Sequence, residues 1–147
     1  MPEPLTFTQD KFTFTVPTDR YYNAAGVWAK ADGERVTVGV SDFFQQHNGD
    51  VAFAEVAETG TTVTTNEEFA NIETIKLDID LPSPISGKIV AVNEALELEA
   101  ERINHDPYGD GWLAEFKADD WAVAIKALMT PAQYFEHMKS QAQAESG

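Results

Sequence analysis

Residues 71–80 read NIETIKLDID, and two runs of alternating apolar and polar residues meet there at a lysine. One run leads into Lys76 through residues 69–74, and the other leaves it through residues 77–81. Such alternation is typical of strands with one buried face. Because no Gly, Pro or Asn separates the runs, Lys76 lies either in mid-strand, paired with an acid across the sheet, or at a tight turn. A turn would expose its ammonium group at the tip of a hairpin.

Short strands are predicted on both sides of this stretch. Asp32-Gly33 joins two such runs, and this dipeptide is a strong hairpin signal. Turn residues at 59–60 and 82–87 separate further runs. Many short strands at close spacing predict a β-sandwich or barrel. The predicted strands are 12–16, 27–30, 35–40, 51–56, 68–74, 77–81, 87–92 and 112–116.

Four helices are predicted, two of them near the C-terminus. Each begins at a residue type that caps helix N-termini, and Asn48-Gly49 supplies a left-handed stop for the first helix. Strands first and helices last indicate an α+β fold that is mostly β. The predicted helices are 41–49, capped by Ser41; 93–100, capped by Asn93; one that begins at Asp119-Asp120; and one opened by Thr130-Pro131.

The length of 147 residues suits a single domain. We expect residues 23–140 to form it, with residues 1–22 as an N-terminal extension and residues 141–147 as a flexible tail. No apolar run approaches the roughly 20 residues that span a bilayer, and the first residues include neither a basic nor an apolar segment. We therefore expect a cytoplasmic monomer.

The chain is strongly acidic and has no cysteine. Its 10 Lys and Arg residues and 25 Asp and Glu residues give a formal net charge of -15 at pH 7. This charge repels phosphate backbones and anionic membranes, so neither nucleic acid nor a membrane is expected as a partner. The acidity reflects either docking to a basic surface or adaptation to high salt. Without cysteine there is no disulfide, zinc–thiolate site or thiol nucleophile.

No residue other than Lys76 stands out as a chemical site. His47 lies near Asp42 and Asp50, but no two histidines have the spacing of metal ligands, so no metal site is predicted. The serines sit in no nucleophile-elbow pattern, and the glycines form no phosphate-binding loop. We therefore predict no catalytic residue.

Three longer runs resemble one known family. They are VTVGVSDFFQQHNGDVAFAEV at 36–56, NIETIKLDIDLPSPISGKIVAVNEAL at 71–96 and INHDPYGDGWL at 103–113. Together they resemble the H-protein of the glycine cleavage system, a lipoyl carrier. The resemblance implies a barrel-sandwich hybrid of the biotinyl/lipoyl-carrier type, with two small antiparallel sheets, short helices and C-terminal helices.

The resemblance also implies lipoate bound covalently to Lys76. The family's E-S-V-K-A segment, whose lysine lies at a hairpin turn, matches ETIKL at 73–77. Glu73 and Asp78 become candidates for presenting this lysine to a lipoate-attaching ligase and for docking partners. Lipoate carries a dithiolane that opens and closes by thiol–disulfide exchange, so the chain would shuttle an intermediate between partner enzymes. The expectation that the protein is not an enzyme comes from this resemblance.

One departure from the family pattern bears on the pathway. The family usually has H-E-W before its first hairpin, where this chain has Gly26-Val27-Trp28. On this ground the sequence favours a lipoate-binding protein of sulfur oxidation that works with a heterodisulfide-reductase-like complex. The alternatives are a glycine cleavage H-protein that carries the aminomethyl intermediate between the glycine cleavage enzymes, and an unlipoylated scaffold. A biotin carrier is disfavoured because Ile75 and Leu77, instead of methionines, flank the lysine.

Overall fold

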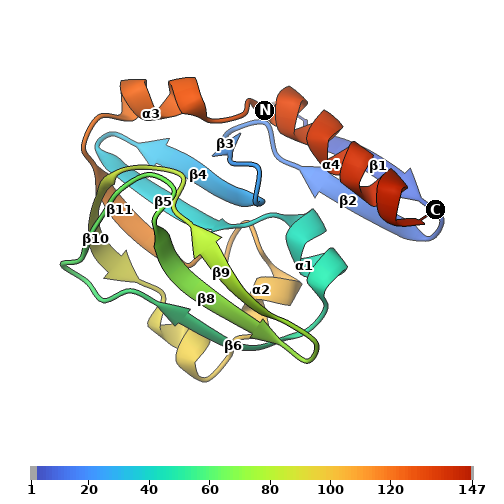
Figure 1. The fold of residues 1–147 in the computed structure, drawn as a ribbon, viewed down its shortest axis with the longest axis horizontal. Helices are drawn as coiled ribbons and strands as arrows, with labels where there is room; N and C mark the ends of the chain where they lie inside the picture. Colours follow the sequence, from blue (N-terminus) through green and yellow to red (C-terminus); the bar gives the residue numbers. More distant parts are fainter. Residues whose placement is uncertain (1–2, 147) are drawn as a thin grey trace.

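Eleven strands in three antiparallel sheets form the framework of the structure, a computed structural model that describes residues 3–146 (Figure 1). The largest sheet has the strand order β3-β4-β5-β11-β10-β7, and the second has the order β6-β8-β9. A separate N-terminal hairpin pairs β1 with β2. The strands are β1 (Leu5–Gln9), β2 (Phe12–Val16), β3 (Tyr21–Tyr22), β4 (Val27–Asp32), β5 (Arg35–Val40), β6 (Val51–Val56), β7 (Thr62–Val63), β8 (Glu68–Thr74), β9 (Asp78–Pro82), β10 (Gly87–Val92) and β11 (Ala114–Ala118).

The main core lies between the two larger sheets. Phe69 on β8 and Phe116 on β11 are buried and meet edge to face, with ring centroids 5.7 Å apart. Ile72 on β8 and Leu81 on β9 belong to the same core. Burial of each such side chain contributes about 1.5 to 3 kcal/mol, so the alternation of residues fixes which face of a strand turns inward. The sheet β6-β8-β9 consequently has one buried face and one open face.

Most predicted strands are confirmed, and β2, β5, β6, β8 and β10 have the predicted bounds. Strand β4 is two residues longer than predicted, β9 is displaced by one residue, and β11 begins at Ala114 instead of Trp112. Strands β1, β3 and β7 are absent from the prediction. Two of them, β3 and β7, have only two residues each and are strands because they pair with β4 and β10.

Five short helices complete the described part of the chain. Ser41 caps the first as predicted, because its Oγ accepts the N–H of Phe44 at 3.1 Å. The helix predicted at 93–100 is present only as a four-residue 3-10 helix, and the Asn93 amide donates to two carbonyl oxygens of the segment 110–112 instead of capping it. In residues 3–146, no helix is long and apolar enough to cross a membrane. The helices are α1 (Asp42–Asn48), η1 (Glu94–Glu97), α2 (Arg102–His105), α3 (Trp121–Ala127) and α4 (Pro131–Ser146).

The N-terminal hairpin and α4 lie side by side and form a second core (Figure 1). Phe14 of β2 and Tyr134 of α4 are buried in it, together with Ala142. Because Ala142 packs there, the segment predicted as a flexible tail is helical as far as Ser146, and residue 147 lies outside the described residues. The predicted N-terminal extension, residues 1–22, ends inside the largest sheet, since β3 pairs with β4.

Candidate functional site

Lys76 lies in the three-residue loop between β8 and β9, at the tip of what we call the lysine hairpin (Figure 1). It is therefore at a turn and not in mid-strand. The N–H of Thr74 donates to the carbonyl oxygen of Leu77 at 2.8 Å. The hydroxyl oxygen of Thr74 accepts the N–H of Leu77 at 3.0 Å and that of Lys76 at 3.3 Å. These bonds close the loop, although its sequence has none of the usual turn residues.

The side chains of this loop face solvent. Lys76 is exposed, Ile75 is 83% exposed and Leu77 is 49% exposed. Within the part of the chain that the structure describes, Lys76 forms no ion pair. The loop thus presents a primary amine between two exposed apolar side chains, an arrangement open to a modifying enzyme.

Glu73 and Asp78 lie opposite each other at the base of the loop. The structure brings these two acids together but pairs neither of them with Lys76 in residues 3–146. The amide of Asn71 donates to the carboxylate of Asp78 and, at 2.9 Å, to Oδ1 of Asp80. The open face of the lysine hairpin is therefore negatively charged, and the charges repel one another.

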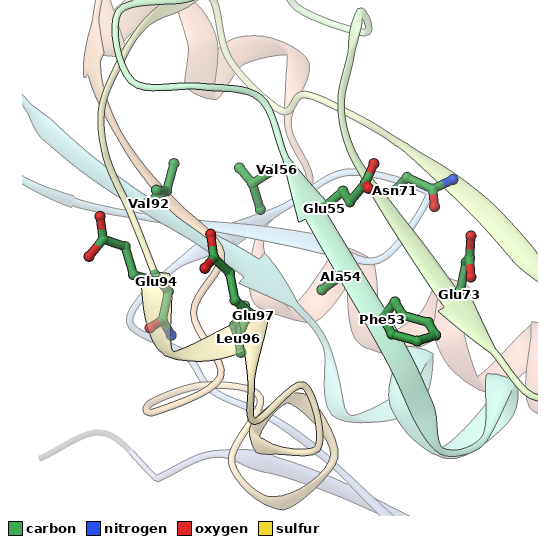
Figure 2. Close-up of a pocket in the computed structure, with 11 residues that line it drawn as sticks. Phe53, Ala54, Glu55, Val56, Asn71, Glu73, Val92, Glu94, Leu96 and Glu97 are labelled. Carbon is green, nitrogen blue, oxygen red and sulfur yellow. The ribbon is translucent and has the colours of Figure 1, made fainter.

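An acidic groove of about 540 Å³ adjoins this face (Figure 2). Strands β6 and β8 form one side of the groove, and the end of β10 with η1 forms the other. Phe53 lines it, is 63% exposed and lies opposite Glu73 in the strand register. The lining contains no cation. Its carboxylates are those of Glu55, Glu73, Glu94 and Glu97.

A smaller cavity of about 260 Å³ reaches the lysine hairpin from α1 and α4, and we call it the helix-side cavity. The hydroxyl groups of Tyr134 and Ser41 are hydrogen-bonded at 2.7 Å beside it. Burial raises the pKa of Tyr134 to about 12, so this hydroxyl is neutral at neutral pH. The lining is mostly apolar and aromatic, and it consists of Ala24, Ala25, Phe43, Phe44, His47, Asn48, Leu77, Ile79, Tyr134 and Gln141.

The two positions that depart from the family pattern lie behind this cavity. Gly26 is buried and has φ +90°, and a Cβ placed on it would lie 3.2 Å from Oη of Tyr134 and 3.3 Å from Oγ of Ser41. A larger side chain there would displace α4. Val27 is fully buried in the main core, where a carboxylate would lose its hydration without a partner. Both positions are therefore closely packed in this chain.

The residues near His47 hold helix α1 in place. The ring of His47 stacks on Phe43 with centroids 5.3 Å apart. Asp42 accepts the N–H of Thr15 at 3.0 Å and so joins α1 to β2. Among residues 3–146, no group of three or more His, Asp or Glu side chains is arranged to hold a metal ion.

The fold and the lysine hairpin define a class of protein: a β-rich domain that displays one exposed lysine at the tip of a hairpin. The family model described as glycine cleavage H-protein matches residues 20–141. The chain belongs to the glycine cleavage H-protein family, and the resemblance seen in the sequence is thereby confirmed.

Individual relatives agree. The probable glycine cleavage system H protein of Natronomonas pharaonis is 46% identical over 122 residues, which are 83% of this chain and 95% of that protein. The glycine cleavage system H protein of Thermus thermophilus is 38% identical over 86% of this chain and 98% of its own. The crystal structure of a glycine cleavage system H protein from Mycobacterium marinum matches with a TM-score of 0.72 and 33% identity, over 81% of this chain and 95% of that chain.

Membership in the family settles the general properties of the chain. Proteins of this family are carriers without catalytic activity of their own, and they bear lipoate covalently on a lysine. The predicted fold, mostly β with antiparallel sheets and C-terminal helices, is confirmed; the structure has a third sheet, the two-stranded N-terminal hairpin. Strands β1 and β2 precede the matched residues, so the N-terminal hairpin is an addition to the family's shared domain.

Sequence reasoning missed two features of the site. The first is Thr74, whose hydroxyl helps to close the loop; a threonine directly before the loop, two residues before Lys76, is its only local signal. The second is the acidic groove, which joins β6 and β8 to the distant segment 92–97. No local pattern indicates that contact, because it arises from the way the sheets pack.

Proposed function

We propose that this chain is the lipoyl carrier of a glycine cleavage system, with lipoate bound through an amide to Nζ of Lys76. The observation that carries the proposal is the exposed amine of Lys76 at the tip of a fixed hairpin, in the segment that matches the family's acceptor motif. Family membership supports lipoate as the attached group. The names of the reported relatives support glycine cleavage as the pathway.

The residues around Lys76 fit such a group. The amine has no ionic partner in residues 3–146 that acylation would leave unpaired. Ile75, Leu77 and the apolar helix-side cavity offer contacts for a long hydrocarbon arm. When bound, lipoate supplies a dithiolane that is opened, loaded and closed by thiol–disulfide exchange. The chain has no cysteine to compete in that exchange.

The chain would supply attachment and docking, and its partners would supply the chemistry. A lipoate-attaching ligase would install the arm, and the glycine cleavage enzymes would load and unload it in the cytoplasm. Glu73 and Asp78, at the base of the loop, would meet any enzyme that reaches Lys76. Their charge favours partners with basic residues at the same place.

The hypothesis of a sulfur-oxidation carrier with a heterodisulfide-reductase-like complex has less support. It rests on Gly26 and Val27, which replace the family's His-Glu pair. Both residues have a packing reason in this chain, since Gly26 lies against Tyr134 and Val27 lies in the main core. The reported relatives are glycine cleavage H proteins, and they favour the glycine cleavage alternative.

Intact-mass measurement tests the attachment. The purified chain is incubated with a lipoate–protein ligase, lipoate and ATP. One lipoyl increment is expected on the parent chain and on Lys88→Arg, a control at an exposed lysine on β10, and none on Lys76→Arg. An increment that persists in Lys76→Arg would place the arm elsewhere. The absence of any increment on the parent chain would support the unlipoylated scaffold.

Reconstitution tests the pathway. The lipoylated chain is mixed with the decarboxylase and the aminomethyltransferase of a glycine cleavage system, and glycine turnover is followed together with the mass of the arm. Turnover with an aminomethyl increment on the carrier is the expected result. A lipoylated carrier that supports no turnover and gains no increment would refute the glycine cleavage assignment.

A further inference from the structure

Every hydrogen bond that the structure shows for the loop 75–77 involves Thr74. Its backbone N–H donates to the carbonyl oxygen of Leu77 at 2.8 Å. Its hydroxyl oxygen accepts two further N–H groups, from Leu77 at 3.0 Å and from Lys76 at 3.3 Å. The side chain of Thr74 is buried at the end of the hairpin, with the residue 9% exposed, so its hydroxyl lies inside the turn.

No other hydrogen bond is shown for this loop in the described chain. The loop contains no Gly, Pro, Asn or Asp, the residues that set the backbone of most tight turns. The side chains of Ile75 and Lys76 are exposed and are not anchored by packing. A threonine hydroxyl that accepts N–H groups two and three residues further along the chain substitutes for such turn residues. The loop is therefore held by one backbone hydrogen bond between Thr74 and Leu77 and by the hydroxyl oxygen of Thr74, which is the only side-chain atom of the described residues that is hydrogen-bonded to it.

We propose that Thr74 is a positioning residue for Lys76: its hydroxyl fixes the loop in the one conformation that the lipoate-attaching enzyme accepts. This inference rests on the proposed attachment at Lys76. Attachment consumes ATP, which activates the carboxylate of lipoate as an acyl-adenylate with release of pyrophosphate. The deprotonated amine of Lys76 then attacks the acyl carbon, the amide bond forms as AMP leaves, and the proton passes to solvent.

The mechanism makes a kinetic prediction. Without the hydroxyl the loop samples several conformations, and the enzyme binds only the fraction that is correctly folded. The apparent affinity falls by that fraction, while the rate of the bound complex is unchanged. The loss of one hydrogen-bond acceptor of this kind changes the equilibrium between the correctly folded loop and its other conformations about three- to tenfold. The effect thus appears in KM and not in kcat.

Two variants of Thr74 separate the hydroxyl from the shape of the side chain. Thr74→Val keeps the branched shape and removes the acceptor, whereas Thr74→Ser keeps the acceptor and removes the methyl group. With a purified lipoate–protein ligase, lipoate and ATP, Thr74→Val is expected to raise KM for the carrier about three- to tenfold at constant kcat. Thr74→Ser is expected to restore the parent value.

A matched control and a direct measurement complete the test. Thr8→Val makes the same chemical change on the N-terminal hairpin, where the hydroxyl of Thr8 bonds only to that of Thr13 among the described contacts, and it is expected to leave KM unchanged. Amide exchange measured by NMR is expected to speed up at Lys76 and Leu77 in Thr74→Val and not in Thr74→Ser.

The outcomes distinguish this inference from the proposed function. If the parent chain gains no lipoyl group at Lys76, the proposed function fails. If the parent chain is modified and Thr74→Val has the same KM, the positioning role is refuted while the proposed function stands. It is also refuted if Thr74→Ser is as impaired as Thr74→Val, because the methyl group and not the hydroxyl would then be responsible.

Discussion

The N-terminal hairpin and the lysine hairpin are alike in local structure and differ in what covers them. In the N-terminal hairpin, Phe14 and Val16 are buried against α1 and α4, and the hydroxyl of Tyr108 donates to the carbonyl oxygen of Thr15 at 2.7 Å. In the lysine hairpin one face is buried in the main core, while the tip and the other face are open. Coverage, and not strand pairing alone, decides whether a hairpin adds stability or displays a reactive group.

Truncation of an apolar side chain in each hairpin tests this difference in coverage with the largest expected effect. Phe14→Ala should lower the free energy of unfolding by about 3 to 5 kcal/mol, because Phe14 packs edge to face on Phe43 at 5.3 Å and leaves a cavity when removed. Ile75→Ala, at an exposed position, should change it by less than about 0.5 kcal/mol. Urea denaturation of both variants measures the difference, and equal losses would contradict it.

Alkaline pH should destabilise the protein through buried tyrosines near the N-terminal hairpin. Burial raises the pKa values of Tyr22, Tyr108 and Tyr134 there, that of Tyr134 to about 12. The tyrosine hydroxyls of the unfolded chain ionise near pH 10, whereas those of the folded chain stay protonated to higher pH. The stability that these buried tyrosines contribute is therefore fully present below about pH 10 and is lost as pH rises toward about 12. The free energy of unfolding should fall by about 1.4 kcal/mol per pH unit in this window for each tyrosine.

Urea denaturation between about pH 10 and about pH 12 measures this slope. Tyr134→Phe is the control. It removes the contribution of one tyrosine, so the free energy of unfolding should fall less steeply with pH. A slope that is the same in parent and variant would show that Tyr134 does not stay protonated in the folded state.

Gly26→Ala tests how tightly α4 is packed behind the lysine hairpin. The added Cβ meets Tyr134 and Ser41 and must adopt φ +90°, so a loss of about 2 kcal/mol is expected. Gly33→Ala is the matched control: it also has positive φ, but nothing lies within 4 Å of its Cβ. Gly33→Ala should lower the free energy of unfolding by about 1 kcal/mol, through the strained backbone conformation alone. Thermal or urea unfolding compares them, and equal losses would mean that packing at Gly26 is not the cause.

The smallest effect is expected on the open face of the lysine hairpin. Glu73 lies opposite Asp78, and like charges in this register repel. Glu73→Gln should therefore raise the free energy of unfolding by a few tenths of a kcal/mol at low salt. The gain should vanish near 1 M salt, where the screening length is about 3 Å. A gain that is independent of salt would show that repulsion is not its source.

The sequence predicted those strands whose faces differ in polarity, because periodicity reports burial directly. Strands β5 and β8 were therefore found with their bounds, and Ser41 marked the start of α1. Strands β3 and β7 exist only through their partners, and α4 extends past residue 140 because Ala142 packs on the N-terminal hairpin. These outcomes depend on tertiary contacts that no window of sequence contains.

The candidate site was predictable in part. Two alternating runs on either side of Lys76, together with the acceptor motif, indicated a hairpin tip. From the sequence, the absence of the family's His-Glu pair indicates a change of pathway. The close approach of Gly26 to Tyr134, which lies 108 positions further along the chain, has no local signature in the sequence. Residues that touch across such separations become visible only in the folded chain.

Strand β9 forms an edge of its sheet: it pairs with β8 on one side and with no strand on the other in residues 3–146. An unpaired edge beside the exposed Ile75 and Leu77 would serve as a template for the same edge of a second copy. The charges of Asp78 and Asp80 and the missing N–H of Pro82 oppose that pairing. These features protect the chain against self-aggregation at an edge strand that lies beside the exposed tip of the lysine hairpin.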